Sequence, residues 1–165
     1  MGEFNIITWN INGCSTTKLK LHRMFKYAVG NKVAVILLQE TRCSQKGWIK
    51  QNIDPLGMYC ECIIESINSD TQCASSGVCI IIMKGYSISN ISTVLDDNTI
   101  NDKWVHPSSA EKSLGRVLAV KFSVSDQDYI VGNFYAPSDS KKSRRSFYLH
   151  YLRALSQFRD DNLIL

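Results

Sequence analysis

The sequence has little of what marks a membrane or secreted protein. Its 165 residues contain no apolar run long enough to cross a bilayer. The N-terminus begins at once with strand-like sequence, and it lacks the basic segment followed by an apolar segment that identifies a signal peptide. These absences predict an intracellular protein of the nucleus or cytoplasm, not secreted and with no membrane partner.

Zinc-binding and disulfide patterns are also missing. None of the six cysteines forms a Cys-x-x-Cys pair, and the three histidines lie far from the cysteines in sequence. This spacing argues against a zinc site. In a chain without a secretion signal, the cysteines are best interpreted as reduced, small apolar residues.

The composition is that of an ordinary globular domain. A chain of 165 residues, 44% of them hydrophobic, can bury a usable core. We therefore predict a single domain over residues 1–165. The net charge of +4 fits an anionic partner but does not require one.

The clearest strand in the sequence is the continuous apolar run 33–38, which is typical of a strand buried on both faces. This run leads directly into Gln39 and Glu40. Open α/β sheets bind their ligands at such strand ends. Glu40 is therefore a candidate site residue; the alternative is a solvated loop residue.

A second strand precedes it and ends near Asn10. Between the two strands, four apolar residues recur at the spacing of one helix face: Leu21, Met24, Phe25 and Ala28. Strand, helix and strand in this order predict a right-handed crossover between parallel strands. Asn10 and Glu40 would then emerge at the same edge of one sheet. An amide and a carboxylate placed together there could hold a hard cation.

The rest of the chain predicts further strands, a short helix near Trp48 and an amphipathic last helix. The strands are expected at 59–64, 78–83, 86–94, 116–125 and 128–134, with a hairpin turn at 125–127 and the start of another strand at 162–165. The apolar face expected for the last helix comprises Tyr148, Tyr151, Leu152, Leu155 and Phe158. The irregular segment 95–113 is either a functional loop or a variable surface loop.

Five short motifs carry a family resemblance. They are Trp9-Asn10-Ile11-Asn12-Gly13, Leu38-Gln39-Glu40-Thr41-Arg42, Ser76-Gly77-Val78, Gly115-Arg116-Val117 and Asn133-Phe134-Tyr135-Ala136-Pro137. In this order they resemble the endonuclease/exonuclease/phosphatase superfamily, and Asn-Ile-Asn-Gly is most similar to the endonucleases of non-LTR retrotransposons. The resemblance implies the N-terminal part of the four-layered α/β sandwich of the deoxyribonuclease I-like fold, with a mixed β-sheet and flanking helices. We expect the chain to supply chiefly one of its sheets.

The resemblance also implies a function, namely metal-dependent hydrolysis of phosphodiesters by the DNA endonuclease of a retroelement. The implied cofactor is Mg²⁺, with Mn²⁺ as a substitute, and the implied partners are DNA and a downstream reverse transcriptase region. Glu40 matches the family's metal-binding glutamate, and Asn10 matches the asparagine that orients the metal shell or phosphate. Tyr135 matches a tyrosine whose phenol could donate to a phosphate oxygen. The structural alternatives are a turn cap at Asn10 and an aromatic ring packed on Pro137 at Tyr135.

Four further residues are candidates for binding phosphate or nucleic acid. Asn12 occupies a position that is aspartate in many abasic-site endonucleases, and Arg42 lies where relatives carry a basic residue near the phosphate. Ser138 replaces the asparagine that is usual in the family. Arg116 could contact a phosphate or pair with an internal acid. Asn12 could instead form a turn, and Arg42 could be an ordinary surface residue.

The basic run 141–145 adds two more phosphate-binding candidates, Lys141 and Arg144. It lies near the start of the last predicted helix, where Asp139 or Ser140 could cap the free amides. Positive charge there opposes the helix dipole, and a docked anion would remove the conflict. The alternative is a solvated basic face.

Two motifs of the family are absent from residues 1–165: Gly-Asp-x-Asn and the terminal Asp-His pair. None of His22, His106 and His150 has an equivalent setting. We therefore expect a C-terminally truncated domain that is inactive by itself. The alternatives are a non-catalytic nucleic-acid-binding or interaction remnant, and a phosphatase or phospholipase of the same superfamily.

Overall fold

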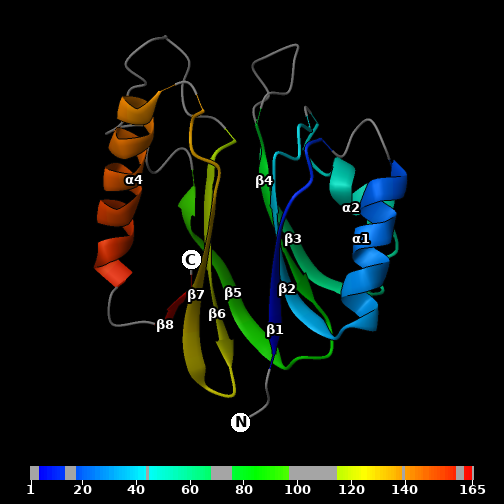
Figure 1. Ribbon diagram of the computed structural model, residues 1–165. Coiled ribbons are helices and arrows are strands. Elements are labelled where there is room, and N and C mark those ends of the chain that lie inside the picture. Colours follow the sequence, from blue (N-terminus) through cyan, green and yellow to red (C-terminus); the bar gives the residue numbers. More distant parts are fainter. Residues whose placement is uncertain are drawn as a thin grey trace.

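The computed structural model describes residues 4–13, 18–43, 45–67, 76–96, 115–138, 140–158 and 162–164. Two four-stranded sheets lie face to face in it, and helices cover their outer faces (Figure 1). The elements are β1 (Asn5–Asn10), α1 (Lys18–Gly30), β2 (Val33–Gln39), α2 (Trp48–Ile53), β3 (Cys60–Ser66), β4 (Val78–Met83), β5 (Ile88–Asp96), β6 (Val117–Val124), β7 (Gln127–Phe134), α4 (Lys141–Leu155), η1 (Ser156–Phe158) and β8 (Asn162–Ile164). The strand orders are β1-β2-β4-β3 and β5-β6-β7-β8. The predicted four-layered α/β sandwich is confirmed.

The expectation that the chain supplies chiefly one sheet is wrong. The strands from β5 onward form a second sheet, and β6 and β7 pack against β2 and β4 of the first. The core between the sheets joins residues of β2 and β4, such as Val35 and Ile80, to Leu118, Phe122 and Val131. A strand that is apolar on both faces needs a cover on each face, and the helices cover only one. The second sheet supplies the other cover.

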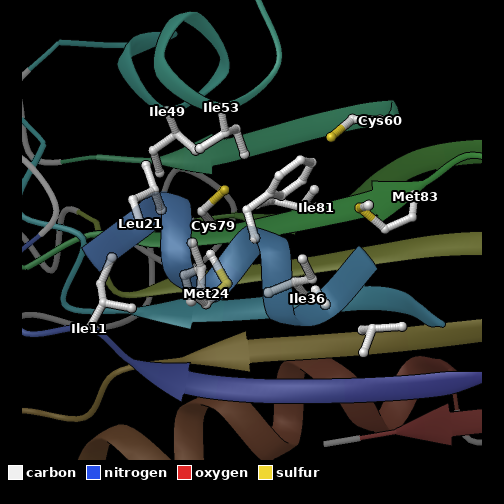
Figure 2. Close-up of a cluster of buried hydrophobic side chains, with 14 of the residues drawn as sticks. Ile11, Leu21, Met24, Ile36, Ile49, Ile53, Cys60, Cys79, Ile81 and Met83 are labelled. Atoms are coloured by element: carbon white, nitrogen blue, oxygen red, sulfur yellow. The ribbon is translucent and has the colours of Figure 1, made fainter. Parts of the chain in front are cut away.

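The outer face of the first sheet is covered by α1 and α2, as Figure 2 shows. Alternate residues of β2, among them Ile36 and Leu38, point to this side because side chains alternate along a strand. The predicted apolar face of α1 is confirmed, since its four residues are all buried: Leu21, Met24, Phe25 and Ala28. The helices therefore fix the first sheet from outside while the second sheet fixes it from inside.

The predicted crossover at the N-terminus is also confirmed. Strands β1 and β2 pair in parallel, and their registers place Asn10 opposite Gln39. Strand β4 pairs with β2 in the antiparallel direction, so the first sheet is mixed. Both parallel strands therefore end at the same edge of the sheet, and Glu40 follows directly at that edge.

The segment after β2 is held by backbone hydrogen bonds to the residues before β4. The amide of Thr41 donates to the carbonyl of Gly77 at 3.0 Å, and the amide of Arg42 donates to that of Ser76 at 2.7 Å. Gly77 itself donates to Gly115, which precedes β6. Glu40 and Arg42 both have left-handed backbones, with φ of 52° and 51°. The left-handed positions on either side of Thr41 turn the chain out of the strand while these bonds hold it.

The last helix differs in one respect from its prediction. Its buried residues are Ser143, Phe147, Tyr151 and Leu155, whereas Tyr148 and Leu152 are exposed. Aromatic residues occupy two neighbouring stripes of α4. Apolar spacing alone therefore does not show which stripe is buried, and the predicted face was partly wrong. The predicted hairpin is confirmed: Ser125 and Asp126 have φ of 50° and 63°, which suits a two-residue type I′ turn.

Several features of the sequence fall outside the described residues. They include 97–114, Asp139, Cys14 and Cys73. Four cysteines lie within the described residues, and all four carry free thiols, as expected from the sequence: Cys43, Cys60, Cys62 and Cys79. Burial, together with the nearby charge of Asp54, raises the pKa of Cys60 to about 12, so this thiol is inert. The described helices include none with the length and apolar character needed to span a membrane.

Replacing Gly77 with alanine tests the crowding beside Thr41. A Cβ at Gly77, whose φ is 114°, would lie 2.1 Å from Oγ1 of Thr41 and 3.2 Å from the amide nitrogen of Arg42. We expect Gly77→Ala to lower the free energy of unfolding by about 3 kcal/mol, measured by urea denaturation. The matched control is Gly57→Ala, because Gly57 also has a positive φ, of 63°, but open space around it. This control should cost only about 1 kcal/mol. Equal losses in the two variants would show that the close approach is not a constraint.

Candidate active site

Asn10 and Glu40 meet at the edge where β1 and β2 end. The side-chain amide of Asn10 donates to Oε1 of Glu40 at 2.7 Å. The oxygen of the same amide accepts from the backbone of Asn12 at 3.0 Å, and Asn12 has a left-handed φ of 47°. The backbone of Gly13 also donates to the carbonyl of Glu40 at 2.7 Å. Asn10 is therefore held by the turn that follows it, and it presents its NH₂ group to the carboxylate.

Arg42 occupies the other oxygen of the same carboxylate. Its Nη2 lies 2.6 Å from Oε2 of Glu40 in an ion pair. The side chain of Glu40 is 13% exposed and that of Arg42 is 43% exposed. The guanidinium therefore reaches the enclosed carboxylate from the solvent side.

The carboxylate of Glu40 is a stable anion. Partial burial by itself would raise its pKa, but hydrogen bonds from Asn10, Arg42 and Tyr135, together with the charge of Arg42, outweigh burial and lower the pKa overall. Burial and the neighbouring Glu40 raise the pKa of Tyr135. At neutral pH the site thus holds an ionised acid beside a phenol that keeps its proton and can donate it in a hydrogen bond.

Arg116 fixes Tyr135 from the second sheet. Its Nη1 donates to the carbonyl of Tyr135 at 3.2 Å, and its guanidinium carbon lies 5.5 Å from the centre of the Tyr135 ring. The amide of Tyr135 donates back to the carbonyl of Arg116 at 2.8 Å. The stacking of Arg116 on the ring is a contact that neither sequence-based alternative included. It orients the phenol toward Glu40.

Asn133 is a site residue that the sequence did not identify. It is 2% exposed, and its side-chain amide donates to the carbonyls of Leu38 and Cys79, both at 2.9 Å. Its oxygen accepts from Nε2 of Gln39 at 2.6 Å, and Gln39 also donates to Thr8 at 3.0 Å. One buried amide of β7 thus joins β2 and β4 across the two sheets. The available signal was the presence of Asn in a strand, where this residue is depleted.

An open cleft of about 690 Å³ runs beside this edge, between the two sheets and the start of α4. Its lining brings together four of the predicted residues: Asn10, Tyr135, Ser138 and Arg144. Nη1 of Arg144 donates to the carbonyl of Ser138 at 3.3 Å, and Ser140 caps α4 by accepting from the amide of Ser143 at 3.0 Å. Lys141 is exposed in the first turn of the helix and does not line the cleft. Figure 1 shows this turn at the same end of the sandwich as the end of β1.

The donor set fits a magnesium ion that keeps most of its water. Glu40 offers an ionised carboxylate with about four lone-pair sites, and the hydrogen bonds from Asn10, Arg42 and Tyr135 leave one of them for a metal ion. Mg²⁺ is commonly bound through one or two carboxylates and several waters. Within the described ranges, no three His, Cys, Asp or Glu side chains form a cluster. Glu40 would therefore hold the ion, and Asn10 would orient the carboxylate.

The sequence and the fold place the chain in a known class. It belongs to the endonuclease/exonuclease/phosphatase family, whose sequence profile matches residues 7–165. No curated protein matches the sequence. Membership in this family agrees with the resemblance carried by the five motifs.

Solved structures share the fold. They include an AP endonuclease from Archaeoglobus fulgidus (19% identity, TM-score 0.57), AP endonuclease LMAP from Leishmania major (17%, 0.60) and TDP2 from D. rerio in complex with a single-strand DNA product (14%, 0.57). The matches cover 94%, 93% and 93% of this chain but 52%, 48% and 54% of those structures. At these identities the likeness establishes the fold alone. The chain spans about half the length of the structures that it matches.

Replacing Asn133 with alanine tests the link between the sheets. The substitution leaves the carbonyls of Leu38 and Cys79 without this donor, and we expect it to lower the free energy of unfolding by about 2–3 kcal/mol. The matched control is Asn162→Ala, which removes one exposed hydrogen bond to the carbonyl of Asp128 and should cost less than about 1 kcal/mol. Thermal or urea unfolding measures both. A loss at Asn133 no larger than that at Asn162 would rule out this role.

Proposed function

We propose that residues 1–165 form an incomplete endonuclease domain that contributes the metal-binding part of the active site, and that the complete domain hydrolyses DNA phosphodiesters with Mg²⁺. The observation that carries the proposal is the 2.7 Å contact between Asn10 and Glu40 at the ends of two parallel strands. It fixes the orientation of an ionised carboxylate next to Asn10 and Tyr135, which line an open cleft. Mn²⁺ is expected to substitute for Mg²⁺.

The chemistry follows from the charge of a phosphodiester, whose anionic oxygens repel a nucleophile. A magnesium ion held by Glu40 would neutralise the charge that develops on the phosphate. Asn10 keeps the carboxylate in place. The protonated phenol of Tyr135 can donate to a phosphate oxygen once it releases its hydrogen bond to Glu40, and Arg116 keeps that ring in position. The resemblance assigns the general base to a motif that residues 1–165 lack.

The start of α4 supplies a surface for the DNA backbone. Arg144 and Ser138 line the cleft together with Asn10, and Lys141 lies exposed in the same turn of the helix. No acidic residue occurs in the first turn of α4, where Lys141 and Arg144 lie. Phosphate groups of a nucleic acid fit this charge. Asn12 and Arg42 are proposed as further contacts near the scissile phosphate.

The retroelement origin rests on the Asn-Ile-Asn-Gly segment at 10–13. It implies a reverse transcriptase region downstream and action on DNA in the nucleus or cytoplasm. The coding sequence beyond codon 165 discriminates between the candidates. An open frame with Gly-Asp-x-Asn, Ser-Asp-His and a reverse transcriptase favours the endonuclease, while an immediate stop codon favours a non-catalytic binding remnant. A phosphatase or phospholipase of the same family would instead carry specificity loops for its own substrate.

The role of Glu40 is tested by metal binding. We expect the chain to bind Mn²⁺, followed by the electron paramagnetic resonance signal of the free ion, and Glu40→Gln to lose this binding because the amide has no charge. The matched control is Glu61→Gln on β3, where an exposed glutamate undergoes the same change. Equal Mn²⁺ binding by the two variants would refute the metal site.

The activity of residues 1–165 alone is tested by the nicking of plasmid DNA. Residues 1–165 are expected to leave supercoiled plasmid DNA intact in Mg²⁺, because two family motifs are absent from them. Robust nicking that depends on Mg²⁺ and is lost in Glu40→Ala would show instead that the catalytic set is complete.

The basic start of α4 is tested by charge reversal. Lys141→Glu with Arg144→Glu should abolish salt-sensitive retention of DNA, measured by filter binding at increasing salt. Acidic residues in a first turn favour the helix dipole, so α4 should remain folded. The matched control is Arg23→Glu with Lys26→Glu on exposed positions of α1, which changes the net charge equally. If the α4 variant retains DNA as well as the unmodified chain does, the start of α4 does not bind the DNA backbone.

A further inference from the structure

Arg42 is the one charged group paired with Glu40 among the described residues. The other described partners of the carboxylate, Asn10 and Tyr135, are neutral donors. The ion pair is short, with Nη2 of Arg42 at 2.6 Å from Oε2 of Glu40. This guanidinium puts a positive charge beside the carboxylate to which a metal ion would bring a second one.

We infer that Arg42 is an internal counter-cation, which occupies Glu40 in the metal-free protein and leaves the carboxylate when a divalent cation binds. The inference rests on the proposed function, because it assigns the divalent cation to Glu40. It adds that the chain itself sets the affinity of this site by competition.

The backbone conformation of residues 40–42 keeps the side chains of Glu40 and Arg42 close together. Glu40 and Arg42 both adopt left-handed φ values, of 52° and 51°, which are costly for residues other than glycine and asparagine. The bonds from Thr41 to Gly77 and from Arg42 to Ser76 hold the chain in this shape. A guanidinium and a carboxylate two residues apart are thus kept side by side by fixed backbone.

The side chain of Arg42 has room to leave. It is 43% exposed, whereas its own amide is anchored to Ser76, so the guanidinium can turn toward solvent without any change in the backbone. A metal ion and a guanidinium on one carboxylate would lie close enough to repel each other. We therefore expect the ion pair to open as the metal binds.

Removing the positive charge while keeping the length of the side chain tests the competition. Arg42→Met should bind Mn²⁺ at least about fivefold more tightly than the unmodified chain, a coupling of the size usual between two linked sites. The readout is the electron paramagnetic resonance signal of free Mn²⁺, which needs no catalytic activity. If only Arg42→Met binds Mn²⁺ detectably, this result also supports the competition, because the unmodified chain then binds too weakly to be measured.

Two variants serve as controls. Arg42→Lys keeps the charge and should retain the affinity of the unmodified chain. Arg23→Met removes one exposed charge from α1 and should leave the affinity unchanged. Far-ultraviolet circular dichroism and the midpoint of urea unfolding verify that each variant is folded.

The contrary outcomes separate the inference from the proposed function. Unchanged or weaker Mn²⁺ binding in Arg42→Met, with binding still lost in Glu40→Gln, overturns the competition and leaves the metal site intact. Mn²⁺ binding that is insensitive to Glu40→Gln, or absent from every variant, overturns the metal site and the inference together.

Discussion

The buried amide of Asn133 is the contact on which the geometry of the site depends. It lies in β7 and donates to carbonyl groups of β2 and β4, so it fixes one sheet against the other at the end where both carry functional groups. Apolar packing between sheets tolerates small shifts, whereas directional hydrogen bonds to two strands do not. This link sets the position of Tyr135 relative to Glu40. Tyr135 lies two residues after Asn133, and Glu40 lies two residues after Leu38, whose carbonyl accepts from Asn133.

Charge at the site is balanced locally. Glu40 is ionised, and its neighbours are two neutral donors and one guanidinium. Because Arg42 approaches from the solvent side, the acid stays compensated while remaining accessible. An enclosed carboxylate without such a partner would be costly to bury. The site therefore combines a largely enclosed anion with a cation whose side chain is 43% exposed.

The sequence was informative where the signal is local. The apolar runs and the helix face between them predicted β1, α1 and β2, and the parallel pairing expected of strand, helix and strand predicted that Asn10 and Glu40 meet. The two buried faces of β2 and β4 also implied a second cover, yet nothing local identified β6 and β7 as that cover. Asn133 contacts residues 54 and 95 positions away, and no spacing in the sequence marks such a pairing. In α4, two adjacent stripes carry aromatic residues, and the sequence pattern does not show which of the two stripes is buried.

The left-handed backbone at Glu40 has an evolutionary consequence. Glycine or asparagine would occupy this conformation with less strain, by about 1 kcal/mol or more, so a chain selected only for folding gains by losing the glutamate. Homologous sequences that are not selected for this carboxylate are free to change at residue 40 without harm to the sandwich. A glutamate kept at this position across homologues would therefore point to selection for something other than folding.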